Sequence, residues 1–212
     1  MVHLLAFSAS LIARFSFAKD IRWKTLLFDV IKIFEILFLE LERSLKMAAS
    51  ILEKYFEQNT WANLQIIQAC SALSDELLDA EPQSATKGTI RQTLVHLVYA
   101  EQDYLARLLR RDPRFNWPET PDFDEMEQAI NLTGQDFQAL LRDDPGEALQ
   151  TLIHEDDGYT IEPWVIMVQA INHAAEHREQ IKSMLSSLGV TPPRVDGWKY
   201  GRVTNAMIPP AG

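Results

Sequence analysis

The sequence predicts an all-α protein, an antiparallel four-helix bundle with a short β-hairpin before the last helix. Apolar residues recur at spacings of three and four in several long segments, which is the period of an amphipathic helix. Clusters of Pro, Gly and Asp separate these segments. The chain shows no internal repeat, and short links between long helices favour antiparallel neighbours.

The first two helices occupy the middle of the chain. Residues 50–73 carry apolar side chains at helical spacing. The second helix is expected to begin after Thr89, because Thr89 and Gln92 have the spacing of a capping box, in which each side chain bonds a free backbone amide. Its apolar pattern continues to Leu109.

The third and fourth helices lie in the second half. Residues 122–141 begin with acidic side chains, which the helix dipole favours in a first turn, although Gly134 weakens the helical pattern. The fourth helix is expected to begin at Pro163, because proline suits the first turn. It continues to Leu188 and stops at Gly189, a common residue after a helix end.

Two further segments are not expected to be helical. Residues 148–154 and 159–161 flank the sequence Asp-Asp-Gly at 156–158, which favours a short hairpin. The tail, residues 194–212, is aromatic and is expected to be irregular.

A sharp change of composition predicts a domain boundary between residues 46 and 47. Residues 1–46 carry seven Lys and Arg against five Asp and Glu, whereas residues 47–212 carry 13 against 25. Every Gly and Pro follows residue 46, and six of the ten Phe precede it. Met47 is followed by Ala-Ala-Ser, which would suit an ordinary protein start. We therefore expect 47–212 to form the bundle.

Three interpretations of the leader, residues 1–46, remain open. It is a poor signal peptide, because no Lys or Arg precedes Arg14 and that residue interrupts the apolar run. Its longest run without charge, residues 1–13, is too short for a membrane span. Residues 21–45 suit an apolar amphipathic helix. Alternatively, the leader is upstream sequence translated from a start codon assigned too early.

The overall charge restricts the partners. A formal net charge of −10 argues against a nucleic-acid partner, because such proteins cluster Lys and Arg. It also argues against an anionic membrane surface as a partner of the main domain. A single cysteine, Cys70, cannot form an internal disulfide, which suits a reducing compartment, and we expect a cytoplasmic protein.

The fourth helix carries a pair of histidines with metal-ligand spacing. His173 and His177 are four residues apart, so both rings lie on one helix face and can reach a common ion. Neutral imidazole is a common ligand of zinc, nickel and ferrous iron. The pair lies about 60° from the centre of the apolar stripe, at the edge of the buried face. A chance pair of histidines is the competing interpretation.

The same segment reads His-x-x-Glu-His, a peptidase motif in which Glu176 would act as general base on a water activated by zinc. Such enzymes need a further acidic ligand well downstream, and only 35 residues follow His177. Glu176 is therefore a candidate catalytic residue, and a solvated carboxylate is the alternative.

His96, on the second helix, is the natural third ligand. Its helical angle places it away from the apolar stripe, which argues against a buried core histidine. Spacing alone does not decide whether His96 is a metal ligand or a plain surface residue. His154, on the expected hairpin, is interpreted as a surface residue, and His3 lies in the leader.

Three motifs resemble those of the DinB-like superfamily, which is unrelated to the polymerase of the same name. Residues 55–63 resemble its first helix through Asn-Thr-Trp-Ala-Asn at 59–63. Residues 88–97 look like its second helix, and residues 173–181 look like its fourth. The resemblance covers nearly all of 47–212 and does not cover the leader.

The resemblance implies a four-helix bundle with up-down-down-up connections. It also implies one divalent metal held by His96, His173 and His177, and often a homodimer. Glu179 departs from the usual Gly of the last motif, without a clear effect on the ligands. Characterised relatives are thiol-dependent S-transferases and a thiol-dependent isomerase, so the implied partners are a small-molecule substrate and a low-molecular-weight thiol.

Three functions remain open. Three neutral ligands leave open positions on a divalent ion, as in catalytic metal sites, where the ion can activate a bound thiol or water. Activation of a thiol predicts an S-transferase, and activation of water predicts a hydrolase. The third alternative is a non-catalytic metal-binding stress-response protein. A base or substrate-binding group beside the metal would discriminate between them, and the candidates are Glu176, Gln92, Gln180, Asp103, Trp198 and Tyr200.

Overall fold

The computed structural model describes residues 21–83, 88–114, 120–142, 148–155 and 157–208. The chain divides into two compact units, Met1–Ser50 and Ile51–Gly212. One helix, α2 (Ile21–Ser71), belongs to both units and contains the segments expected as two helices. It continues without interruption because residues 46–50 contain no Gly or Pro, and Lys, Met and Ala favour helix. The predicted boundary at 46 and 47 therefore does not coincide with a helix end.

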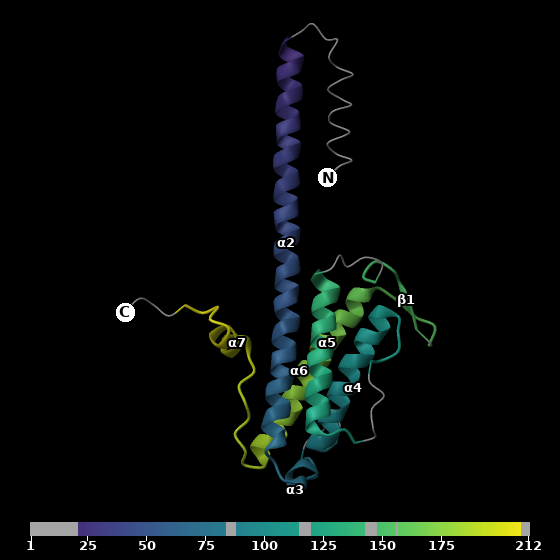
Figure 1. The fold of residues 1–212 in the computed structure, drawn as a ribbon, viewed down its shortest axis with the longest axis vertical. Helices are drawn as coiled ribbons and strands as arrows, with labels where there is room; N and C mark the ends of the chain where they lie inside the picture. Colours follow the sequence, from purple (N-terminus) through teal and green to yellow (C-terminus); the bar gives the residue numbers. More distant parts are fainter. Residues whose placement is uncertain (1–20, 84–87, 115–119, 143–147, 156, 209–212) are drawn as a thin grey trace. The chain divides into compact units, whose positions relative to one another are not determined.

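The second unit is a helical bundle, as the sequence predicted (Figure 1). The end of α2 runs toward the short helix α3, α4 and α5 run in the opposite direction, and α6 returns (Figure 1). This is the expected up-down-down-up order, in which α4 packs against both α5 and α6. The helices after α2 are α3 (Asp75–Leu78), α4 (Ile90–Leu109), α5 (Phe123–Arg142), α6 (Pro163–Ser187) and α7 (Gly197–Val203).

The parallel arrangement of α4 and α5 requires a long connection between them. A 20-residue helix such as α4 is about 30 Å long, so the chain must return over that distance before α5 begins. Residues 110–122 provide about 13 residues, which can span up to roughly 43 Å when extended. The connection is therefore long enough to place two consecutive helices side by side in the same direction.

Local signals at the helix ends act as the sequence predicted. At the start of α4 the Thr89 hydroxyl accepts a hydrogen bond from the backbone N–H of Gln92. The side-chain oxygen of Gln92 accepts one from the backbone N–H of Thr89. Pro163 is in the first turn of α6. After α6, Gly189 adopts φ +75°, a conformation that few residues other than glycine adopt readily. The Val190 amide then donates to the Leu185 carbonyl, which closes the helix.

The expected hairpin is present, and the tail expected to be irregular contains one short helix, α7. Strands β1 (Ile153–His154) and β2 (Thr160–Ile161) pair antiparallel. In the tail, the prediction was wrong over α7, where the Asp196 side chain accepts from the Lys199 amide and caps the helix. A one-turn cap of this kind supports a helix too short to show apolar periodicity.

Gly134, which weakened the prediction of the third helix, has a packing role. A Cβ built at this position would lie 2.5 Å from Oγ1 and 2.6 Å from Cγ2 of Thr60. These separations are shorter than van der Waals contact, so α5 approaches α2 at a distance that only glycine permits. The residue that lowers the helical propensity of α5 thus allows two helices to pack closely.

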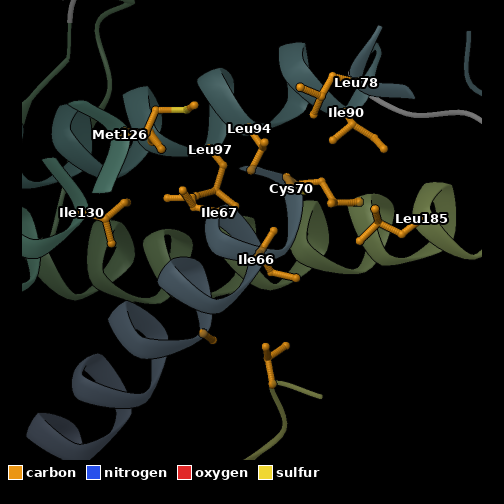
Figure 2. Packing of buried hydrophobic residues seen from close by; sticks show 14 of the residues in the cluster. Ile66, Ile67, Cys70, Leu78, Ile90, Leu94, Leu97, Met126, Ile130 and Leu185 are labelled. Atoms are coloured by element: carbon orange, nitrogen blue, oxygen red, sulfur yellow. The ribbon is translucent and has the colours of Figure 1, made fainter. Parts of the chain in front are cut away.

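The core contains two hydrophobic clusters with a polar layer between them. One cluster includes Ile67 of α2, Leu94 of α4 and Ile130 of α5, which are labelled in Figure 2. The other lies toward the hairpin and includes Phe56 and Phe137, whose rings stack at 4.5 Å. Along the helices, a group of buried polar residues falls between the two clusters: Asn59, Asn63, Glu101, Gln102, Thr133, His177 and Arg178.

The first unit exposes many apolar side chains. Phe28 and Phe34 are 59% and 65% exposed, and other large apolar residues of α2 before Ser50 are similarly accessible. No helix among the residues that the structure describes is long and apolar enough to cross a membrane. His3 lies outside the described residues.

Candidate metal centre

Three histidines meet within the bundle unit. His96 comes from α4, and His173 and His177 come from successive turns of α6. The Nε2 atom of His173 lies 3.0 Å from Nε2 of His96 and 3.1 Å from Nε2 of His177. One ligand atom from each ring lies within 4.8 Å of the others. The structure thus brings together the three residues that the sequence predicted as ligands.

The rings surround a common point at different angles. Their centroids lie 4.3 to 4.9 Å apart, and the His177 ring is nearly perpendicular to the ring of His96. His177 is 6% exposed, whereas His96 and His173 are half-buried. The Tyr104 ring contacts the His173 ring edge-on, with centroids 5.5 Å apart. The cluster therefore has a buried side and an accessible side.

The donor set fits a divalent ion. At a bond length of about 2.0–2.1 Å, two imidazole nitrogens are separated by roughly 3.3 Å at a tetrahedral angle and by roughly 3.0 Å at a right angle. The separations of 3.0 and 3.1 Å are therefore compatible with either arrangement after shifts of a few tenths of an ångström. Three neutral nitrogen donors suit zinc, nickel or ferrous iron and do not select among them.

His177 has a hydrogen-bond partner on the ring nitrogen that lies outside the cluster. Nδ1 of His177 lies 2.8 Å from Oε1 of Gln180, which is one turn further along α6. Of the candidate groups suggested by the sequence, Gln180 is bonded directly to a histidine of the cluster.

Next to the histidine cluster, four buried polar residues form a closed ring of hydrogen bonds. The Arg178 guanidinium donates to the side-chain oxygens of Asn59 and Asn63, at 2.7 and 2.5 Å. The amide groups of both asparagines donate in turn to Glu101 Oε1, at 2.6 and 3.1 Å. The ring therefore joins α2, α4 and α6 beside the histidines, since Arg178 directly follows His177.

Burial opposes both charges in this ring. Desolvation raises the pKa of the Glu101 carboxyl, while the bonds from Asn59 and Asn63 and the charge of Arg178 act to lower it. Desolvation likewise lowers the pKa of the Arg178 guanidinium, and Glu101 acts to raise it. The net pKa shift of each group is thus toward its neutral form, and the opposite charge offsets part of the effect of burial.

The remaining candidates have other surroundings. Glu176 is exposed on α6 next to His177, and its role as a base stays a prediction. The side chain of Gln92 is part of the α4 cap. Asp103 faces Arg107 at 3.7 Å. His154 is exposed and contacts the Thr160 hydroxyl, in agreement with its interpretation as a surface residue.

The two aromatic candidates of the tail differ from each other. Trp198 is 69% exposed. The Tyr200 ring packs on Trp61, with centroids 5.3 Å apart, and its hydroxyl donates to Glu57. The pKa of Tyr200 is raised, chiefly by burial. Tyr200 thus attaches the tail to α2.

Sequence reasoning missed the buried ring and the contact of Tyr104. A signal for the ring was present, because Asn59 and Asn63 continue the apolar spacing of α2 between Phe56 and Ile66. Polar residues at core positions of an amphipathic helix indicate partners on neighbouring helices. The same signal was present for Glu101, which continues the apolar spacing of α4 between Leu97 and Leu105.

Comparison with known proteins assigns the chain to a family. The DinB family matches residues 45–209, which cover all the elements from the bundle part of α2 to α7. No curated protein matches the chain. Because the match covers most of the chain and includes the three histidines, the chain belongs to the DinB family.

Proposed function

We propose that the protein binds one divalent metal ion through His96, His173 and His177, and that it is a thiol S-transferase acting on a small electrophilic molecule. The observation that carries the proposal is the convergence of the three Nε2 atoms, at 3.0 and 3.1 Å, from two helices. Membership of the DinB family supports the metal site. A homodimer stays a prediction.

The chain itself supplies no reactive thiol. Cys70 is fully buried in the core, and burial raises the pKa of its thiol to about 12. A thiol at such a pKa is almost entirely protonated near neutral pH, and the thiolate is the nucleophile. Any thiol that reacts at this site must therefore come from a cosubstrate.

The proposed reaction joins the cosubstrate thiol to the electrophile. When bound, the ion would supply a positive charge that favours loss of the thiol proton to water. The thiolate sulfur attacks an electrophilic carbon, a carbon–sulfur bond forms, and a leaving group departs with its electron pair. The three histidines are neutral donors, so they leave the positive charge of the ion undiminished. The polar ring and the hydrophobic clusters hold α4 and α6 in place around it.

The metal site is tested with histidine variants of the full chain. Protein purified without an affinity tag is analysed for metal, and the affinity for Zn²⁺ is measured by competition with a chelator. We expect His96→Ala, His173→Ala and His177→Ala each to lose the metal, because a two-ligand site loses much of its affinity. His154→Ala is the matched control and should bind as the wild type does. Full affinity in His96→Ala would remove α4 from the site.

The activity is tested with a low-molecular-weight thiol and an activated aryl chloride. Release of chloride and formation of the thioether are measured with the metal present and after its removal. We expect conjugation that depends on the metal and that falls in acid, because protonated histidines release the ion. A fully loaded protein that accelerates no conjugation would favour the non-catalytic alternative.

A hydrolase is the second candidate, because Glu176 is exposed next to His177 on α6. If Glu176 is a general base for water, Glu176→Gln should keep the metal and lower turnover by about 10²-fold or more. In the S-transferase the same substitution should change the rate little. Hydrolysis that is unaffected by Glu176→Gln would exclude this residue as the base.

A further inference from the structure

Gln180 contacts Nδ1 of His177, whereas the other ring nitrogen, Nε2, lies in the histidine cluster. Its side-chain oxygen, Oε1, lies 2.8 Å from Nδ1 of His177, one helical turn away. A carbonyl oxygen carries no hydrogen and can only accept, so with Oε1 in this position the hydrogen of the bond belongs to Nδ1. This orientation of the Gln180 amide favours the imidazole tautomer that is protonated at Nδ1.

This choice determines what His177 presents to its neighbours. A neutral imidazole has a single N–H, so protonation at Nδ1 leaves Nε2 with a free lone pair. That Nε2 atom is the one that lies 3.1 Å from Nε2 of His173, inside the cluster. We propose that Gln180 is a positioning residue that holds His177 in the tautomer with a bare Nε2, and thereby raises the metal affinity of the proposed site. The inference rests on the proposed metal site.

The surroundings make the bond effective. His177 is 6% exposed, so water competes poorly for its Nδ1, and Gln180 is half-buried on the same helix. A side-chain amide rotated by half a turn would offer an N–H to Nδ1 and place the imidazole proton on Nε2, where it would exclude an ion. An amide also adds no charge, whereas a carboxylate at this position would reduce the positive charge of a bound ion.

The tautomer is measured directly on the metal-free full chain. Nitrogen NMR of ¹⁵N-histidine-labelled protein above the titration range of its imidazoles distinguishes Nδ1-protonated from Nε2-protonated rings. We expect His177 to be Nδ1-protonated in the wild type and in Gln180→Glu, which keeps an acceptor oxygen. Gln180→Leu should show a mixture of tautomers. If Gln180 had a merely structural role, Gln180→Leu would leave the tautomer of His177 unchanged.

The effect on binding is measured with Zn²⁺ and a competing chelator. Gln180→Leu should weaken binding by about 10- to 100-fold, the usual range for removing a partner of a ligand histidine. Gln180→Glu should bind at least as tightly as the wild type. Gln128→Leu, the same substitution at an exposed position of α5, is the matched control and should have no effect.

The outcomes separate this inference from the proposed function. An Nε2-protonated His177 in wild-type protein, or unchanged Zn²⁺ affinity in a folded Gln180→Leu chain, would overturn the role of Gln180 while the metal site stands. A wild-type chain that binds neither Zn²⁺ nor Ni²⁺ would overturn the proposed function and the inference with it. Thermal unfolding of the metal-free variants shows whether each is folded.

Discussion

Replacing Arg178 by methionine tests whether the buried polar ring stabilises the bundle through a pair of charges. Methionine keeps an unbranched apolar chain, so most of the packing of the arginine stem is retained. The substitution removes the two hydrogen bonds to the asparagine oxygens of Asn59 and Asn63. It also leaves the Glu101 carboxylate, which is 4% exposed, without its cation.

The structure gives two routes to the expected magnitude. Removing one partner of a buried ion pair costs about 3–5 kcal/mol. Two hydrogen bonds from a charged donor, at about 1.5–3 kcal/mol each, lead to the same range. We therefore expect Arg178→Met to lower the free energy of unfolding by about 4 kcal/mol. For a domain of this size that corresponds to a Tm lower by roughly 8–16 °C.

A second substitution distinguishes the charge from the packing. Glu101→Gln still accepts from Asn59 and Asn63 through its amide oxygen, but it carries no charge. The double variant Arg178→Met/Glu101→Gln should therefore be more stable than Arg178→Met by about 1–3 kcal/mol, because no uncompensated charge remains buried. Urea unfolding of the metal-free proteins measures the free energy of unfolding of the wild type, of Arg178→Met and of the double variant. Unchanged m-values indicate that the three unfolding transitions are comparable.

The pH dependence provides a further check. The charge of Arg178 acts to lower the pKa of Glu101, so in Arg178→Met that pKa, already raised by burial, rises further. The folded state then holds a proton that the unfolded state releases above the ordinary value of 4.5. Its stability should fall as the pH rises from that value, by at most about 1.4 kcal/mol per pH unit, and the double variant should lack this dependence.

Two results would refute this reasoning. A loss of less than about 1 kcal/mol in Arg178→Met would mean that the guanidinium contributes no more than an exposed pair does. A double variant that is no more stable than Arg178→Met would mean that the cost arises from packing, and that the Glu101 charge is not compensated by Arg178.

Three further predictions concern other parts of the chain. Gly134→Ala should destabilise the protein by about 1–3 kcal/mol in urea unfolding, because its Cβ meets Thr60, and Thr60→Ala should restore much of the loss; a stabilised Gly134→Ala would show that the helices separate freely. Cys70 should react with iodoacetamide at pH 8 about 10³-fold more slowly in the folded than in the unfolded chain, because a pKa of about 12 instead of 9.0 reduces the thiolate fraction by that factor; rapid modification of folded protein would show that the core opens. A chain beginning at Met47 should unfold cooperatively and bind Zn²⁺ as the full chain does, since the family match begins at residue 45; insoluble protein would instead make residues 21–45 part of the core.

Local signals in the sequence determined the main helices of the bundle and two of the three proposed ligands. The apolar spacing, the cap formed by Thr89 and Gln92, and the stop at Gly189 act within one or two turns, so they can be read from neighbouring residues. The pair formed by His173 and His177 is local in the same sense, because any α-helix places residues four apart on one face.

Only the tertiary structure decided which residues meet between helices. His96 is 77 positions from His173, and spacing could not distinguish a ligand from a surface residue, so only the family resemblance had implied that the two meet. The partners of Arg178 and Glu101 likewise come from other helices, and the close approach at Gly134 depends on Thr60 of α2. These contacts depend on how each helix is rotated and placed against its neighbours, and that arrangement follows from the packing of both hydrophobic clusters together rather than from any single segment.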